Sequence, residues 1–238
     1  MNTPVSTYAE SALFTDLTYH FTDRFDIQLG GRSSWLKQSY AQTDTGAYVG
    51  LALMAESPLV TPKSFANENA FTYLVTPRLK LSDDLMLYAR LASGYRAGGI
   101  NQTIAPDTPR VFGPDETQNY ELGVKGRALD RRVSFDASVY RIDWKDIQIA
   151  LADPASGQGY FVNGNRGKSE GMELSMEVVL AEGLHIGSWV AWNDAVLSTA
   201  MPANSTAYGA AGSRLPYSSR WSANASLDYR FPVLGVTG

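Results

Sequence analysis

The chain has 238 residues, of which 44% are hydrophobic, 11% aromatic and 18% charged, and its formal net charge is −4. This composition excludes a disordered chain, and no apolar run approaches the roughly 18 residues of a transmembrane helix. The small negative charge gives no basis for binding nucleic acid, so we expect no nucleic-acid partner. Cysteine is absent, which excludes disulfides, thiolate metal sites and a cysteine nucleophile.

Short turn signals divide the chain at regular intervals. They are Thr22-Asp23-Arg24, Ser82-Asp83-Asp84, Leu129-Asp130-Arg131 and Ala181-Glu182-Gly183, with a fifth expected within residues 232–238. Between them lie stretches rich in Gly, Pro, Ser, Thr and Ala, at roughly residues 42–66, 97–115, 151–168 and 199–217. Short and long connections therefore alternate. The intervening arms are longer than the roughly 5–6 residues of typical soluble strands.

Apolar and polar residues alternate along these arms, and successive side chains of a strand point to opposite faces. The clearest example is the predicted hairpin formed by residues 119–127 and 133–139, and the other alternating runs are 25–35, 85–92, 172–178 and 221–231. No segment shows a helical period. The sequence predicts an all-β fold of about nine antiparallel strands connected as up-and-down hairpins.

Aromatic residues gather near the ends of the predicted strands, for example Trp35, Tyr120, Trp144, Trp221 and Tyr229. Long strands, aromatic ends, and short turns alternating with long loops are typical of transmembrane β-barrels, in which apolar side chains face lipid. A large soluble sheet with one wet face gives the same alternation, so both architectures remain open from the pattern alone.

Two residues leave the strand register open. Pro77 lacks an N–H group for the sheet ladder, so its strand either bulges there or begins late. Arg141 continues the apolar register of Phe135, Ala137 and Val139. Either it lies above the hydrocarbon, where a long basic side chain reaches headgroups, or the register changes before it.

Three stretches resemble the β-barrel of TonB-dependent outer-membrane receptors. They are YARLASGYRAGGINQ (88–102), PDETQNYELGVKGRALDRRVSFDASVYRIDWKDIQI (114–149) and NGNRGKSEGMELSMEV (163–178), and LTYHFTDRFDIQLGGRSSW (17–35) is similar to an earlier hairpin. The motif Gly-x-basic-Ala-Gly-Gly spans Gly94 to Gly99. The resemblance covers nearly the whole chain.

The resemblance implies a barrel of about 22 strands in the Gram-negative outer membrane, filled by a plug domain. Its implied partners are lipid, the plug, TonB and a scarce nutrient such as a ferric siderophore, cobalamin or a glycan. The sequence shows no TonB box, plug, closing C-terminal strands or signal peptide. We therefore expect residues 1–238 to be a partial, unclosed barrel, either an internal piece of a longer receptor or the product of a truncated gene.

Candidate site residues fall into two sets. The polar register predicts side chains that face the lumen or the plug: Arg90, Arg96, Glu121, Lys125, Arg127, Glu173 and Glu177. Long loops tend to carry binding residues, and the candidates there are Tyr48, Arg110, Phe112, Tyr160, Phe161 and Tyr208.

Catalytic signals are weak. His20 and His185 lie in separate predicted strands with no motif around them, and RGKSEG (166–171) lacks the earlier glycine of a phosphate loop. We expect no enzyme activity, cofactor or metal. The sequence favours an energy-coupled outer-membrane receptor, with a passive porin-like channel or a soluble β-sheet binding domain as alternatives.

Overall fold

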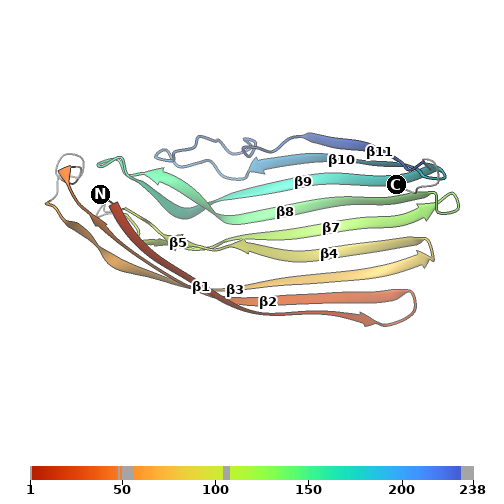
Figure 1. Cartoon of the computed structure of the whole chain (residues 1–238), viewed down its shortest axis with the longest axis horizontal. Helices are drawn as coiled ribbons and strands as arrows, with labels where there is room; N and C mark the ends of the chain where they lie inside the picture. Colours follow the sequence, from red (N-terminus) through yellow and green to blue (C-terminus); the bar gives the residue numbers. More distant parts are fainter. Residues whose placement is uncertain (1, 48, 50–55, 104–107, 232–238) are drawn as a thin grey trace.

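Nine long strands form one antiparallel sheet in the computed structural model, which describes residues 2–47, 49, 56–103 and 108–231. The sheet order is β1-β2-β3-β4-β7-β8-β9-β10-β11 (Figure 1). The strands are β1 (Asn2–His20), β2 (Phe25–Asp44), β3 (Leu59–Ser82), β4 (Leu85–Arg96), β7 (Asp115–Ala128), β8 (Val133–Ala152), β9 (Gly159–Ala181), β10 (Leu184–Leu197) and β11 (Trp221–Tyr229). This confirms the predicted all-β, up-and-down architecture.

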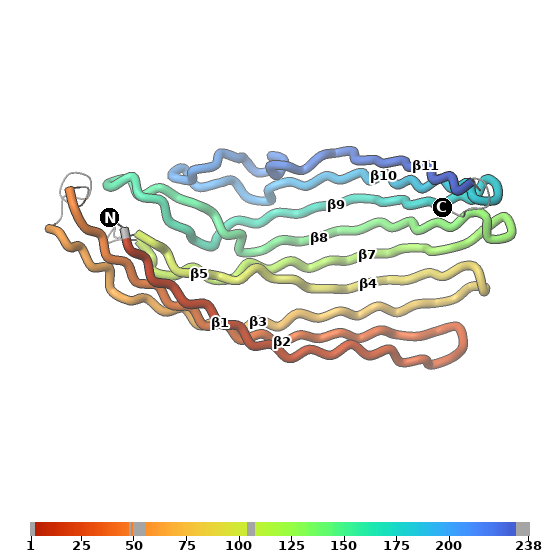
Figure 2. The backbone as a smooth tube through the Cα atoms, viewed as in Figure 1, coloured from red at the N-terminus to blue at the C-terminus, as the bar shows by residue number. Residues whose placement is uncertain are grey.

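The sheet is open, because β1 and β11 form its two edges and do not pair with each other. All four short turns lie at one end of the strands and the longer connections at the other (Figure 2). Leu129, Asp130 and Arg131 of the β7–β8 turn have φ values of 52°, 53° and 65°. Gly183 of the β9–β10 turn has φ 76°, a conformation that glycine adopts without steric cost.

The predicted long connections were placed correctly but two were too long. Strand β2 continues to Asp44 and β3 begins at Leu59, while β8 continues to Ala152 and β9 begins at Gly159. The composition of these ends resembles a loop, yet neighbouring strands keep their ladder beyond the alternating region. The connection at 97–115 also contains a two-strand hairpin, β5 (Gly99–Ile100) with β6 (Val111–Phe112). The turn expected within 232–238 lies outside the described residues.

The connection between β8 and β9 is a loop of residues 153–158 that is closed by Asp153. Its Oδ2 accepts hydrogen bonds from Ser156 Oγ at 2.5 Å and Ser156 N at 2.8 Å, and Gly157 N donates to Asp153 O at 2.7 Å. The Ser156 hydroxyl and amide hold the pKa of Asp153 below its ordinary value. Local hydrogen bonds of this kind explain why only a few residues separate two strands of 20 and 23 residues.

Strand register settles both open questions. Pro77 pairs with Ile27 of β2, and β3 keeps the same register toward β4 on either side of it. The expected bulge or late start at Pro77 is therefore wrong. Its missing N–H interrupts the ladder toward β4 without shifting it. Arg141 lies opposite Tyr120 in an unbroken register, and the shift in β8 comes later, between Trp144 and Ile147.

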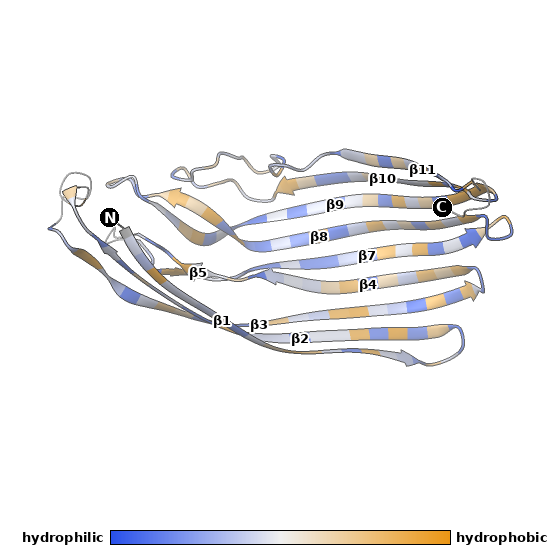
Figure 3. Cartoon of the chain, viewed as in Figure 1, coloured by the Kyte–Doolittle hydropathy of each residue, from blue (hydrophilic) through white to orange (hydrophobic). Residues whose placement is uncertain are grey.

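Hydrophobic and hydrophilic residues alternate along the strands (Figure 3), so the two faces of the sheet differ in polarity. We call the face that carries Leu122, Val139 and Met172 the apolar face. These side chains are 61%, 52% and 52% exposed, so no second layer among the described residues covers them. A soluble sheet would bury such a face against other parts of the protein, so its exposure here favours the lipid-facing alternative.

A small apolar core lies at the end with the long connections. Ile147, Ile149 and Leu151 of β8 are buried together, and the hydrophobic residues packed against them are Trp144, Tyr160, Val162 and Met201. The connection after β10 folds back onto β8, because Ala152 N donates to Asn204 O and Thr206 N to Ala150 O, each at 3.0 Å. Within the described ranges, a helix with the length and hydropathy of a membrane span is absent.

Candidate functional site

Charged side chains gather on the polar face around Tyr88. Arg90 Nη1 lies 3.6 Å from Glu121 Oε2, and Tyr88 Oη donates to Glu121 Oε1 at 2.7 Å. The Tyr88 ring centroid is 5.6 Å from Arg90 Cζ and 5.4 Å from Lys125 Nζ, which itself contacts Asp136 at 2.6 Å. The structure thus brings the predicted residues Arg90, Glu121 and Lys125 together. Tyr88, at the centre, was not predicted as a site residue.

Tyrosine rings on this face cover glycines of the adjacent strand. A Cβ atom on Gly123 would lie 2.3 Å from the Tyr88 ring, and one on Gly171 would lie 2.5 Å from the Tyr140 ring. Each glycine is paired with that tyrosine in the ladder. An aromatic side chain over a strand glycine fills the space that the glycine leaves. Cross-strand pairs of this kind have no local sequence signal.

The other predicted residues of the polar face lie apart from this cluster. Arg127 is at the end with the short turns, where its Nε is 3.2 Å from Asp84 Oδ1. Glu173 and Glu177 lie on β9, and both are exposed. Arg96 is at the opposite end of the sheet.

Arg96 forms an ion pair with Asp115, whose side chain is only 3% exposed. The Arg96 guanidinium also lies over the Trp144 ring, with Cζ 5.9 Å from the centroid. Next to the pair, Gln148 Nε2 donates to Ala97 O at 2.8 Å, and its backbone N lies 3.4 Å from Asp115 Oδ2. The pair thus joins the start of the β4–β7 connection to β8.

The β5–β6 hairpin lies between the extended ends of other strands, with β5 against β2 and β3, and β6 against β9. Gly98 N donates to Glu68 Oε2 and Gln38 Nε2 donates to Gly98 O, each at 2.9 Å. A Cβ atom on Gly98 would lie 2.2 Å from Phe112 O. The hairpin therefore requires glycine at the position that the Gly-x-basic-Ala-Gly-Gly motif supplies.

Two asparagines connect this hairpin to β9 by hydrogen bonds. Asn163 Oδ1 accepts from Gly113 N at 2.6 Å, and its Nδ2 lies 2.9, 3.0 and 2.9 Å from the carbonyl oxygens of Gly113, Pro114 and Asp146. Asn101 exchanges two hydrogen bonds with the Phe161 backbone, at 2.8 and 2.7 Å. Neither asparagine was predicted as a site residue.

We expect Asn163→Ala to loosen the hairpin by about 2 kcal/mol, because Gly113 N and three carbonyl groups lose their side-chain partner. Faster amide hydrogen exchange in residues 99–103 and 108–113 of the complete receptor measures this effect. Asn204→Ala is the matched control, since Asn204 is exposed and bonds Ala152 through its backbone. Equal exchange in both variants would contradict the role given to Asn163.

The residues predicted to lie in binding loops are found partly in strands and partly in loops. Phe112 lies in β6 and Phe161 in β9 rather than in loops, with ring centroids 5.3 Å apart. Tyr160, also in β9, packs on the small core. Arg110 Nη1 donates to Thr103 O at 2.8 Å, and Tyr208 is fully exposed at 100%. Tyr48 lies outside the described residues.

An antiparallel up-and-down sheet with one apolar and one polar face, and with unpaired edges, is the architecture of an incomplete transmembrane β-barrel. A family profile described as TonB dependent receptor-like, beta-barrel, matches residues 1–237. The chain therefore belongs to the TonB-dependent receptor family, whose members are outer-membrane proteins of Gram-negative bacteria.

Curated relatives and solved structures agree with this assignment. The pesticin receptor of Yersinia pestis is 28% identical over 230 residues, which cover 95% of this chain and 31% of the relative. The ferric yersiniabactin uptake receptor FyuA from Yersinia pestis matches with a TM-score of 0.75 at 24% identity, over 98% of this chain and 33% of that one.

The ferric-catecholate import receptor Fiu from K12 E. coli matches with a TM-score of 0.71 at 16% identity, over 95% of this chain and 32% of that one. The siderophore receptor PiuA from Acinetobacter baumannii matches with a TM-score of 0.70 at 18% identity, over 94% of this chain and 31% of that one. The chain thus spans about a third of the length of the proteins it matches. The family is one of transport receptors rather than enzymes.

Proposed function

We propose that residues 1–238 are part of a receptor that imports a ferric siderophore across the outer membrane with energy delivered by TonB. The match of the family profile to residues 1–237 carries this proposal. The names of similar proteins support the substrate class, because they include receptors for ferric yersiniabactin and ferric catecholates. Nine consecutive strands with free edges fit a larger barrel that also holds a plug domain.

The two faces of the sheet have different partners in this proposal. Lipid covers the apolar face, because exposed Leu, Val and Phe side chains are stable only in an apolar surrounding. The polar face borders the lumen and the plug. Its exposed carboxylates Glu173 and Glu177 are suited to basic groups of a plug, whereas Arg90, Glu121 and Lys125 form contacts within the sheet.

The end with the long connections binds the siderophore. Here Phe112 of the β5–β6 hairpin forms an aromatic pair with Phe161 of β9. Arg110 directly precedes β6, and Tyr208 lies in the connection between β10 and β11. Tyr160 supports β9 from the small core. A rigid hairpin with aromatic and basic side chains is suited to a bulky, anionic iron chelate.

Uptake of radioactive iron tests the proposal in cells that carry the complete receptor gene as their sole receptor. Ferric yersiniabactin and a ferric catecholate serve as substrates. We expect accumulation of one chelate that disappears when TonB is deleted or the proton gradient is collapsed. Uptake that continues without TonB would identify a passive channel instead, and uptake of neither chelate would overturn the substrate class.

A further inference from the structure

Strands β3 and β4 separate beyond the end of their shared ladder. Their pairing runs from the short turn to Leu74 and Ala92, and further on β3 continues beside β2 while β4 stays with β7 (Figure 1). Where the two strands part, side chains replace the ladder, because Tyr73 N donates to Ser93 Oγ at 3.0 Å. Gln118 Nε2 of β7 donates to Tyr73 Oη at 2.8 Å. We call the opening beyond these contacts the β3–β4 fissure.

The edge of β3 along this fissure is free. Successive residues of a strand direct their N–H and C=O groups to alternate sides. The hydrogen bond of Tyr73 N toward β4 shows that odd-numbered residues direct these groups to the fissure. Four residues do so beyond the ladder: Phe65, Asn67, Asn69 and Phe71. Among the described residues, no strand is paired with this side of β3 beyond Leu74, so the edge is a template for another strand.

Further strands of a complete barrel would not cover this edge. They would pair with β1 and β11 at the two ends of the sheet, whereas β3 lies between β2 and β4. The β5–β6 hairpin lies on the polar face rather than in the plane of the sheet, since Gly98 contacts the side chains of Glu68 and Gln38. The fissure is therefore open toward the outside of the wall.

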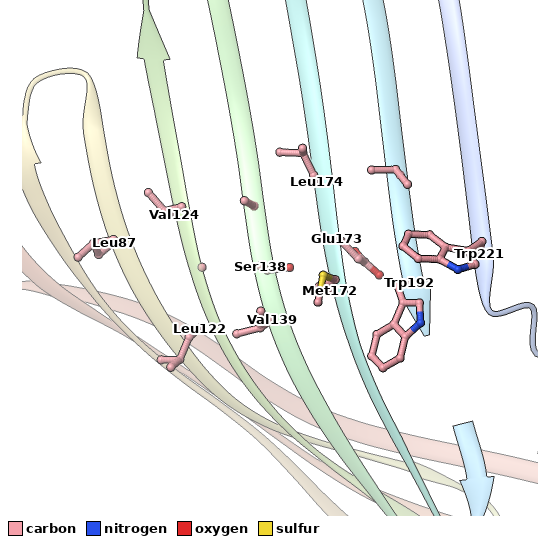
Figure 4. A pocket seen from close by; sticks show the side chains of 13 residues that line it. Leu87, Leu122, Val124, Ser138, Val139, Met172, Glu173, Leu174, Trp192 and Trp221 are labelled. Carbon is pink, nitrogen blue, oxygen red and sulfur yellow. The ribbon is translucent and has the colours of Figure 1, made fainter. Parts of the chain in front are cut away.

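Space is present at the base of the fissure. A cavity of about 110 Å³ lies there between Tyr73 of β3, Tyr95 of β4 and Gln118 of β7. The larger hollow of the apolar face, which includes Met172 and Trp192, lies over paired strands (Figure 4). That hollow presents side chains alone, whereas the fissure also presents backbone donors and acceptors.

The fissure begins where the hydrocarbon ends. Ser93 and Tyr95 are the ninth and eleventh residues of β4, which starts at Leu85. Tyr73 is the tenth residue from Ser82, the last of β3. A transmembrane strand needs about 9–11 residues. With the membrane orientation of the proposed function, the free edge of β3 therefore lies outside the cell.

We propose that this edge binds an extended segment of another extracellular protein, which adds to the sheet as a strand. The proposal rests on the membrane orientation of the proposed function. Backbone hydrogen bonds hold the segment, and alternate side chains provide selectivity. Phe65 and Phe71 point to the outside of the wall and are 63% and 66% exposed. A segment with apolar side chains on its outward side packs beside these two rings, so the partner is a strand with alternating apolar and polar residues.

Binding of a synthetic peptide to the complete receptor in detergent micelles tests this site. The probe is a short fluorescent peptide of alternating valine and threonine, with lysines at its ends for solubility, and fluorescence polarisation measures its binding. The same peptide with N-methylated amides is the matched control, because it keeps the side chains but has no N–H groups for a ladder. We expect the unmodified peptide to bind about tenfold more tightly.

Proline substitutions in β3 test where the peptide binds. N67P/N69P removes two N–H groups from the fissure and leaves the ladder with β2 intact, since proline is tolerated where the N–H of an edge strand is unpaired. We expect this variant to keep its thermal stability and to bind the peptide about tenfold more weakly. Ala70→Pro is the contrasting variant, because Ala70 directs its N–H to Ser34 of β2, and we expect it to destabilise the receptor.

Unchanged peptide binding by N67P/N69P, or equal binding of the N-methylated peptide, would overturn the proposal. Loss of folding in N67P/N69P would also overturn it, because these N–H groups would then be paired already. A receptor dimer that excludes the peptide and that N67P/N69P dissociates would assign the edge to a second copy instead.

The orientation is tested separately by labelling Asn67→Cys in intact cells with a maleimide that does not cross membranes. Absence of labelling would overturn the orientation in the proposed function, and this site with it. Labelling without peptide binding disproves this site alone.

Discussion

Leu174→Arg should destabilise the complete barrel by about 2–4 kcal/mol, the cost of an arginine on the lipid face near the bilayer midplane. Leu174 is on the apolar face, between Ala137 and Val190 in the ladder. Leu174 lies four residues from Glu170 and nine from Gly183 in the β9–β10 turn, so the new guanidinium would be far from either headgroup layer. Urea unfolding of the receptor in lipid vesicles measures this cost.

Ser175→Arg is the matched control, one residue along the same strand. Ser175 lies on the polar face with Asp136 as its ladder partner, so a new guanidinium there remains hydrated and gains a carboxylate neighbour. We expect a change within about 0.5 kcal/mol, as for most surface substitutions. If both variants lose the same stability, the assignment of the two faces is wrong.

The strands and short turns could be predicted because their signals are local. A period of two residues fixes which side chains share a face, and Asp, Gly and polar residues mark tight turns. The faces of Leu122 and Glu121 follow directly from this rule. Arg141 kept its predicted register because the shift in β8 lies beyond Trp144.

The candidate site was harder to predict because its contacts are distant in sequence. Asn163 bonds Gly113, and Asn101 bonds Phe161, across 50 and 60 residues. A residue in a Gly-rich, Asn-rich stretch reads as a loop from composition alone, which is why Phe161 was expected outside a strand. The ladder between β8 and β9 and the amide contacts become visible only in the structure, because they join residues that are far apart in the sequence.

Arg96→Ala should cost about 3 kcal/mol in the free energy of unfolding, the lower end for breaking a buried ion pair because Arg96 itself is half exposed. The cost arises at Asp115, whose carboxylate stays buried at 3% exposure without its cation. The change should also weaken binding of the proposed siderophore, since the pair fixes the start of the connection that carries the β5–β6 hairpin. Urea unfolding and binding of the ferric chelate measure the two effects.

A double-mutant cycle separates this ion pair from the packing of the arginine on Trp144. Asp115→Asn removes the buried charge, so R96A/D115N should recover about half of the stability that Arg96→Ala loses. The asparagine oxygen can still accept from Gln148 N, as the Asp115 carboxylate does at 3.4 Å. If the two substitutions are simply additive, Arg96 acts through its contact with the Trp144 ring, and the carboxylate does not hold the connection in place.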